Sequence, residues 1–153
     1  MTNERRKRVL AVASGGGHWV QLLRLRPAFF DCDIAYVTVQ EDYRSQLDRG
    51  RFYAVTDATR WSRWNLLRMI AEVSWVVIKE RPDVVISTGA APGVVALRIG
   101  KWLGARTIWI DSIANLEQMS MSGKRVRKFA DLCLSQWPDV AIVEGCSHKG
   151  AVL

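Results

Sequence analysis

The stretch Val12-Ala13-Ser14-Gly15-Gly16-Gly17-His18-Trp19 (VASGGGHW) comes directly after the apolar run Val9-Leu10-Ala11. A continuous apolar run predicts a strand that is buried on both faces, as in a parallel sheet. The three glycines predict a tight turn, and the residues from His18 onward predict a helix. A strand, a glycine turn and a helix in this order are typical of the first unit of a doubly wound α/β sheet.

The rest of the chain repeats this alternation of Val/Ile-rich runs with helical patterns. The predicted strands are Arg8–Ala13, Asp33–Val39, Phe52–Thr56, Asp83–Ser87, Thr107–Asp111 and Val140–Val143. The predicted helices are His18–Phe30, Arg63–Glu80, Pro92–Leu103 and Arg125–Gln136. Pro82 and Pro138 each stand between a predicted helix and a predicted strand, where proline ends helices. The fold class that follows is α/β, a Rossmann-like doubly wound parallel sheet in one domain over residues 1–153.

Right-handed crossovers in such a sheet place the first and fourth strands side by side. The loops that follow them are Ser14–His18 and Ser87–Gly93 (STGAAPG), two glycine-rich turns. We therefore expect these loops to meet at the switch point of the sheet, where this fold binds its ligand.

Composition restricts the classes of function. The chain has a net charge of +7 and seven tryptophans among 153 residues, which suits phosphorylated substrates or anionic lipid. Nucleic acid is not expected as a partner, because no recognition motif is present and the basic residues are spread over several elements. The three cysteines, Cys32, Cys133 and Cys146, lack the spacing of a zinc site or a disulfide framework. No apolar run is long enough for a transmembrane helix or a signal peptide.

The glycine turn is open to several interpretations. A P-loop is rejected because no lysine follows the glycines. A dinucleotide fingerprint has its first two glycines here but Val20 at the third position, with Glu41 as a candidate ribose-binding acid. A purely structural turn is the third interpretation. His18 favours an active-site loop, since a neutral imidazole at a helix N-terminus can serve as a base beside phosphate.

Four blocks of sequence resemble one known family. They are Ser14–His18 (SGGGH), Ser87–Gly93, Trp109–Asn115 (WIDSIAN), and Ser122-Gly123-Lys124 followed by Ala130-Asp131 and Gln136-Trp137-Pro138. The chain resembles the N-terminal-half subunit of two-piece GT-B glycosyltransferases. These include the membrane-anchoring subunit of the dolichol-linked UDP-N-acetylglucosamine transferase, bacterial exopolysaccharide and capsule counterparts, and more distantly MurG. Asp111 and Asn115 depart from the glutamate and arginine usual in that family.

The resemblance implies the acceptor-side half of a GT-B fold and a separate donor-binding glycosyltransferase subunit as partner. Together the two would transfer a sugar from a nucleotide sugar to a polyprenyl-pyrophosphate-linked sugar acceptor, and this chain alone would show little activity. His18 is the expected catalytic base. The expected substrate-binding residues are Ser14, Gly15, Gly16, Gly17, Thr88, Gly89, Asp111, Ser112 and Asn115. We expect neither a metal nor another cofactor, and Asp31-Cys32-Asp33 is interpreted as a turn rather than a metal-binding motif.

Two further surfaces are expected. Tryptophan and basic residues together favour an anionic membrane surface, so we expect peripheral association with the cytoplasmic face of the inner membrane. The membrane candidates are Arg60, Trp61, Arg63, Trp64, Arg98, Lys101 and Trp102. The candidates for contact with the partner subunit are Trp137, Val152 and Leu153.

Overall fold

The sheet runs through the middle of the computed structural model, which describes residues 5–58 and 62–152. Its strands are all parallel and lie in the order β3-β2-β1-β4-β5-β6. Their bounds are β1 Arg8–Ala13, β2 Asp33–Thr38, β3 Arg51–Ala54, β4 Val84–Gly89, β5 Arg106–Ile110 and β6 Leu132–Leu134. The predicted Rossmann-like sheet is confirmed, and β1 lies between β2 and β4 as expected.

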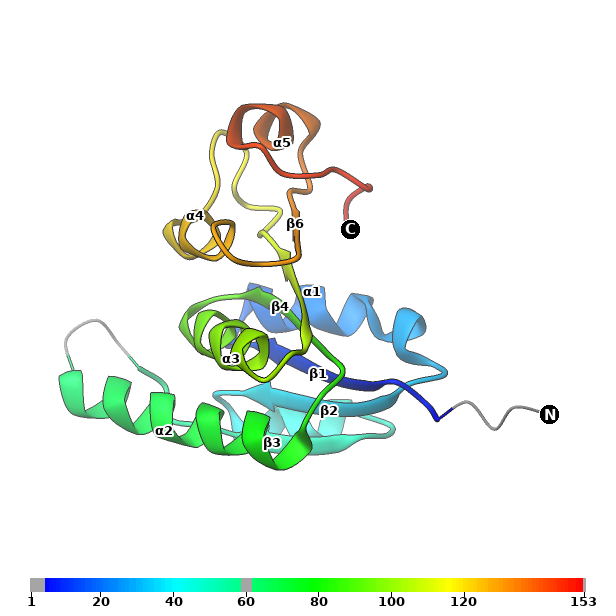
Figure 1. Cartoon of the computed structure of the whole chain (residues 1–153), viewed down its shortest axis with the longest axis vertical. Coiled ribbons are helices and arrows are strands. Elements are labelled where there is room, and N and C mark those ends of the chain that lie inside the picture. The colour runs from blue at the N-terminus through cyan, green and yellow to red at the C-terminus, as the bar shows by residue number, and fades with distance from the viewer. Residues whose placement is uncertain (1–4, 59–61, 153) are drawn as a thin grey trace.

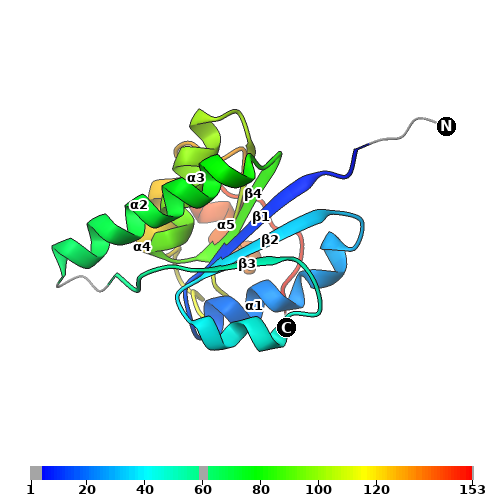
Figure 2. The same cartoon turned by 90° about the horizontal axis from the view of Figure 1, so that it is seen from below.

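Helices cover both faces of the sheet (Figures 1 and 2). The helix α1 (Gly17–Arg24) and the 3-10 helix η1 (Arg26–Phe29) lie on one face, and α2 (Arg63–Glu80) and α3 (Ala91–Trp102) lie on the other. A second 3-10 helix, η2 (Glu41–Gln46), follows β2. The short helices α4 (Met121–Val126) and α5 (Pro138–Glu144) gather around β6 at one end of the molecule.

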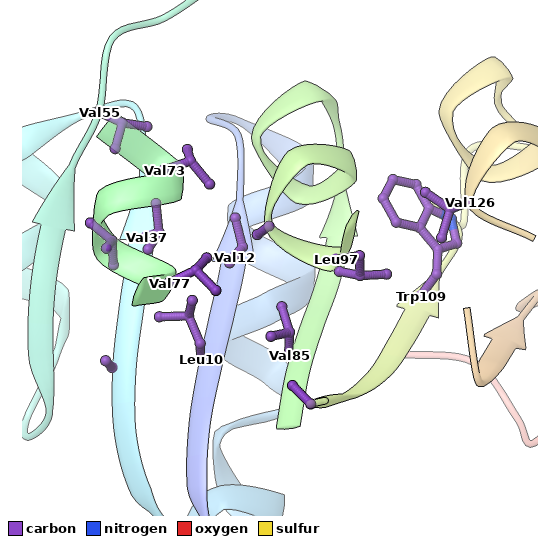
Figure 3. Close-up of a cluster of buried hydrophobic side chains, with 14 of the residues drawn as sticks. Leu10, Val12, Val37, Val55, Val73, Val77, Val85, Leu97, Trp109 and Val126 are labelled. Atoms are coloured by element: carbon purple, nitrogen blue, oxygen red, sulfur yellow. The ribbon is translucent and has the colours of Figure 1, made fainter. Parts of the chain in front are cut away.

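Alternation along the strands divides the core into two layers. Leu10 and Val12 of β1 pack toward α2 and α3, in the cluster shown in Figure 3. Val9, Ala11 and Ala13 face α1 and η1. A period of two along each strand, with apolar residues on both faces, is why these strands read as uninterrupted apolar runs.

The C-terminal prediction was wrong in its last two elements. Val140–Val143 is not a strand but part of α5, and the predicted helix Arg125–Gln136 contains β6. Pro138 opens α5 instead of preceding a strand, because proline at the first helical position loses no hydrogen bond. The strand β6 has only three residues, too few to show a period of its own.

Apart from one divided helix, the other predicted elements agree with the structure to within a few residues at their ends. The predicted helix His18–Phe30 is divided at Leu25 into α1 and η1, because Pro27 has no N–H to continue the α-helical ladder. Pro82 separates α2 from β4 as predicted.

One carboxylate fixes the start of β6 against β5. Asp131 accepts hydrogen bonds from the N–H and the hydroxyl of Thr107 at 2.8 and 3.0 Å, and its own N–H donates back to that hydroxyl at 3.0 Å. Lys101 at the end of α3 also pairs with it. The Lys101 ammonium, and next the Thr107 N–H, hold the pKa of Asp131 below its ordinary value. The register of the short strand β6 against β5 is thus set by the Asp131 side chain as well as by the backbone hydrogen bonds between the strands.

We expect Asp131→Asn to lower the free energy of unfolding at neutral pH by about 1 kcal/mol, because the site is partly exposed. The folded-state pKa of Asp131 is depressed, so its contribution is present above an ordinary aspartate pKa of about 4 and is lost as the pH falls below it. Urea unfolding over a pH series would therefore show the difference from wild type closing in acid. An equal loss in the exposed control Asp57→Asn would contradict this assignment.

Candidate functional site

The two glycine turns meet at the carboxyl edge of the sheet, between β1 and β4. The N–H of Ser14 donates to the carbonyl of Gly89 at 2.8 Å, and the ladder shifts register where Ala13 faces Gly89. The predicted neighbourhood of Ser14–His18 and Ser87–Gly93 is therefore present in the structure.

His18 is joined to Thr88 by two hydrogen bonds that run in opposite directions. Nδ1 of His18 lies 2.9 Å from the carbonyl oxygen of Thr88, and the Thr88 hydroxyl donates to the carbonyl of His18 at 2.7 Å. A carbonyl oxygen only accepts, so Nδ1 carries the proton in the neutral ring and Nε2 carries the lone pair. The half-buried imidazole is thus held with its basic nitrogen turned away from Thr88.

Gly89 makes room for this ring. A Cβ built at Gly89 would lie 2.6 Å from Nδ1 of His18, and the backbone there has a φ of +123°. Both facts exclude a side chain, because only glycine adopts this conformation without strain. The glycine is needed for the imidazole to lie directly on the β4 turn.

A tyrosine that the sequence analysis did not single out supports the other turn. The N–H of Gly16 donates to the hydroxyl of Tyr43 at 3.1 Å, and the Tyr43 ring stacks on Trp19 with centroids 5.2 Å apart. The Gly16 amide, one of the expected ligand donors, therefore already has an acceptor. Gly17 begins α1, where the first N–H groups of a helix have no partner within the helix.

Asp111 holds together the loop that follows β5. Its buried carboxylate accepts hydrogen bonds from Trp109 Nε1 at 3.1 Å, Asn115 Nδ2 at 2.8 Å, the Ser120 N–H at 3.0 Å and the Ser120 hydroxyl at 2.6 Å. The structure thus brings Asn115 and Asp111 together, but their side chains are hydrogen-bonded to each other. Ser112 is half-buried and accepts from Gln21 at 3.2 Å.

Two buried glutamines connect this loop to α1 and to the C-terminal segment. The Oε1 of Gln21 accepts from Gln136 Nε2 at 2.6 Å and from the Ile113 N–H at 3.3 Å. Gln136 also donates to the Asp111 carbonyl at 2.9 Å and accepts from the Val152 N–H at 2.7 Å. Gln21 lies three residues after His18, and its isolation as a polar residue among Val20, Leu22 and Leu23 is the signal that could have found it.

The described membrane candidates are exposed. Trp64 is 83% exposed at the start of α2, where Arg63 is exposed as well, and Trp102 is 72% exposed at the end of α3. The guanidinium of Arg98 lies 6.0 Å from the Trp102 ring centroid and 4.0 Å from that of Phe129, while Lys101 pairs with Asp131. Arg60 and Trp61 lie outside the described residues.

The partner candidates belong largely to the fold of this chain. Trp137 is half-buried and donates to the Ile113 carbonyl at 2.7 Å, and the Val152 carbonyl accepts from Arg24 at 3.2 Å. Leu153 lies outside the described residues. Exposed apolar side chains of this region include Ile142 and Val143 of α5, 79% and 81% exposed, which had been assigned to a strand in the sequence analysis.

Within residues 5–58 and 62–152, no group of three or more His, Cys, Asp or Glu side chains is placed to hold a metal ion. The helices of that part of the chain are too short or too polar to cross a bilayer.

Comparison with known proteins gives consistent results. The family described as "Oligosaccharide biosynthesis protein Alg14 like" matches residues 37–151. The UDP-N-acetylglucosamine transferase subunit ALG14 of Eremothecium gossypii is 27% identical over 167 residues, covering 88% of this chain and 75% of that protein. The mouse subunit of the same name is 28% identical over 168 residues, covering 86% and 76%.

Solved structures share the fold. MurG of Acinetobacter baumannii superposes with a TM-score of 0.76 at 12% identity, over 95% of this chain and 45% of that one. A UDP-N-acetylglucosamine 2-epimerase of Rickettsia bellii gives a TM-score of 0.74 at 13% identity, over 97% and 46%. This chain therefore spans less than half of each of those proteins and corresponds to one half of a GT-B fold.

The geometry around His18 predicts its tautomer. In nitrogen-15 NMR spectra of the neutral imidazole, we expect Nδ1 of His18 to carry the proton and Nε2 to show the shift of an unprotonated ring nitrogen. Gly89→Ala should displace the ring and speed exchange of the Nδ1 proton. The variant His148→Gln leaves one histidine and makes the assignment unambiguous; a dominant Nε2–H form would contradict the geometry.

Proposed function

Because this chain belongs to the Alg14-like family of oligosaccharide biosynthesis proteins, we propose that it is the acceptor-binding, membrane-associated subunit of a glycosyltransferase. A separate chain binds the donor. Together they transfer a sugar from a nucleotide sugar to a polyprenyl-pyrophosphate-linked acceptor in exopolysaccharide or capsule biosynthesis. The names of the relatives, which are subunits of a UDP-N-acetylglucosamine transferase, support an enzyme that is divided between two chains.

The observation that carries the proposal is the locked imidazole of His18. In the transfer, the acceptor hydroxyl oxygen forms a bond to the anomeric carbon of the donor sugar while the bond to the nucleoside diphosphate breaks. Nε2 of His18 takes the proton that this hydroxyl loses. Because the Thr88 carbonyl holds Nδ1–H, the ring offers its lone pair in one fixed direction.

The glycine turn contributes phosphate binding. Ser14, Gly15 and Gly17 surround the start of α1, whose unpaired N–H groups and positive end favour an anion such as the acceptor pyrophosphate. Tyr43 fixes the turn through Gly16. Thr88 and Gly89 act mainly by positioning His18.

The loop after β5 shapes the acceptor-sugar side of the site. Asp111 and Asn115 hold this loop in place through the contacts of the Asp111 carboxylate. Ser112 is the loop residue we assign to the sugar. Its hydroxyl oxygen accepts from Gln21, and this places the hydroxyl beside α1, the helix that carries His18.

A dinucleotide-binding protein is the alternative function. Glu41 is in the place of a ribose-binding acid, but its carboxylate pairs with Arg44 at 2.9 Å. This contact favours the transferase. A non-catalytic interaction module is the other alternative, and the loss of activity on changing His18 distinguishes it.

Association with the membrane is assigned to the outward side of α2 and the end of α3. Residues 63–68 are all exposed, and Trp64, Leu67, Trp75 and Ile78 recur at helical spacing on the side opposite the buried Val73 and Val77. Arg63 and Lys79 add exposed positive charge on α2, and Arg98 and Lys101 add it near the end of α3. Such a surface suits reversible binding to anionic lipid on the cytoplasmic face of the inner membrane.

We expect His18→Ala to lower the rate of the reconstituted pair of subunits by about 10²–10⁴-fold, because general-base assistance is lost. The control His148→Ala changes the chain's other histidine and should keep close to the wild-type rate. Initial rates with a nucleotide sugar and a polyprenyl-pyrophosphate glycan measure the effect. If His18→Ala retains more than roughly a third of the wild-type rate, the histidine is not the base.

We expect the chain to co-sediment with vesicles that contain phosphatidylglycerol and not with neutral vesicles, since each basic residue near anionic lipid contributes about 1 kcal/mol. Trp64→Glu and Trp102→Glu should each weaken this binding several-fold, whereas Ile142→Glu, an equally exposed apolar position on α5, should not. Failure of the wild-type chain to bind anionic vesicles would overturn the assignment.

A further inference from the structure

A groove lies between the edge strand β3 and α2, away from the His18 site. Its volume is about 370 Å³, within the range of about 300–1,000 Å³ typical of small-molecule sites. Tyr53, Ala54 and Val55 form the sheet side, and Ala71, Trp75 and Val76 form the helix side. The rings of Trp75 and Tyr53 meet edge to face, with centroids 6.2 Å apart.

The polar side chains of the groove are already engaged within the chain. The Tyr53 hydroxyl donates to Glu80. The carboxylate of Glu72 accepts from the N–H and the hydroxyl of Thr56 and from Arg68. Burial works to raise the pKa of Glu72, but the Thr56 and Arg68 donors outweigh it and hold the pKa below its ordinary value. The groove therefore presents a ligand with hydrocarbon and aromatic surface.

The groove lies at the same height along the strands as the glycine turn, at the carboxyl edge of the sheet. Ala54 pairs with Thr38 of β2, one residue beyond Val37, which pairs with Val12 of β1. Ser14 and Ala54 are thus at the same edge of the sheet, two strands apart, and this corresponds to about 10 Å. A ligand with its phosphates at Ser14–Gly17 can reach the groove along this edge.

The groove also opens toward the proposed membrane surface. Ala71 and Trp75 continue the spacing of Trp64 and Leu67 along the outward side of α2. The ammonium of Lys79 lies 4.6 Å from the Trp75 ring centroid and 5.2 Å from that of Tyr53, so a cation covers the aromatic pair. Positive charge beside an apolar groove complements a lipid that joins a hydrocarbon chain to an anionic head.

We propose that this groove holds the first isoprenoid units of the lipid-linked acceptor, whose pyrophosphate lies at the glycine turn. The inference rests on the proposed function and adds the site of the lipid chain to it. A hydrocarbon chain needs no hydrogen bonds, which fits a groove whose polar side chains are already paired. Its path leads from the membrane surface of α2 past Ala71 to the carboxyl edge of the sheet.

Calorimetric titration of the whole chain tests this without any catalytic step. Geranylgeranyl pyrophosphate should bind at least about tenfold more tightly than inorganic pyrophosphate, since burial of two methylene groups already corresponds to about tenfold. Ala71→Phe fills the groove from an exposed position and should remove this preference while leaving pyrophosphate binding unchanged. The control Ile142→Phe adds a similar ring at an exposed position of α5, outside both the groove and the proposed membrane surface, and should keep it.

Rates of the reconstituted pair separate this inference from the proposed function. With glycan acceptors on dimethylallyl and geranylgeranyl pyrophosphate, Ala71→Phe should lower kcat/KM for the longer chain alone. An active wild-type pair whose preference for the longer chain survives Ala71→Phe would overturn the groove and leave the proposed function intact. An inactive wild-type pair would count against the proposed function, while the titration still decides the groove. Loss of partner binding in Ala71→Phe with unchanged prenyl binding would assign the groove to a protein and overturn the proposal.

Discussion

The paired hydrogen bonds between His18 and Thr88 are the constraint on which the rest of the site depends. They join the first turn of α1 to the last residues of β4, at the switch point between β1 and β4, where the strand order of the parallel sheet changes direction. The parallel neighbourhood of β1 and β4 brings the two turns together, and the missing side chain of Gly89 lets the ring approach the backbone. The contact between His18 and Thr88 therefore depends on the strand order and the glycine turn, and it fixes the tautomer of the ring. The proposed chemistry uses the other ring nitrogen, Nε2.

The parts of the fold that could be predicted from sequence are those in which burial imposes a pattern. β1 and α2 carry long apolar signals, and their bounds agree with the expectation. β6 and α5 could not be assigned, because a three-residue strand has no measurable period and Ile142 and Val143 look like strand residues although they are exposed. What registers β6 is a contact between Asp131 and Thr107, residues that are far apart in sequence.

The same limit applies to the site. His18 and the two glycine turns could be found because glycine and histidine are unusual after a buried strand. Tyr43, Gln21 and Gln136 hold these parts in place through contacts over 27 to 115 positions of sequence, and no local pattern reports them. Asp111 was identified by resemblance, yet its four donors come from its own loop and strand, so its part is support of the loop.

The hydrogen bond from Nδ1 of His18 is accepted by a main-chain atom, the carbonyl oxygen of Thr88. Every residue type has a main-chain carbonyl oxygen, so no substitution at position 88 can remove this acceptor. A substitution there can remove only the threonine hydroxyl, which donates to the carbonyl of His18. The orientation of the imidazole thus depends on the path of the backbone more than on which side chain stands at position 88. Substitutions elsewhere that preserve this backbone path therefore also preserve the direction in which Nε2 of His18 points.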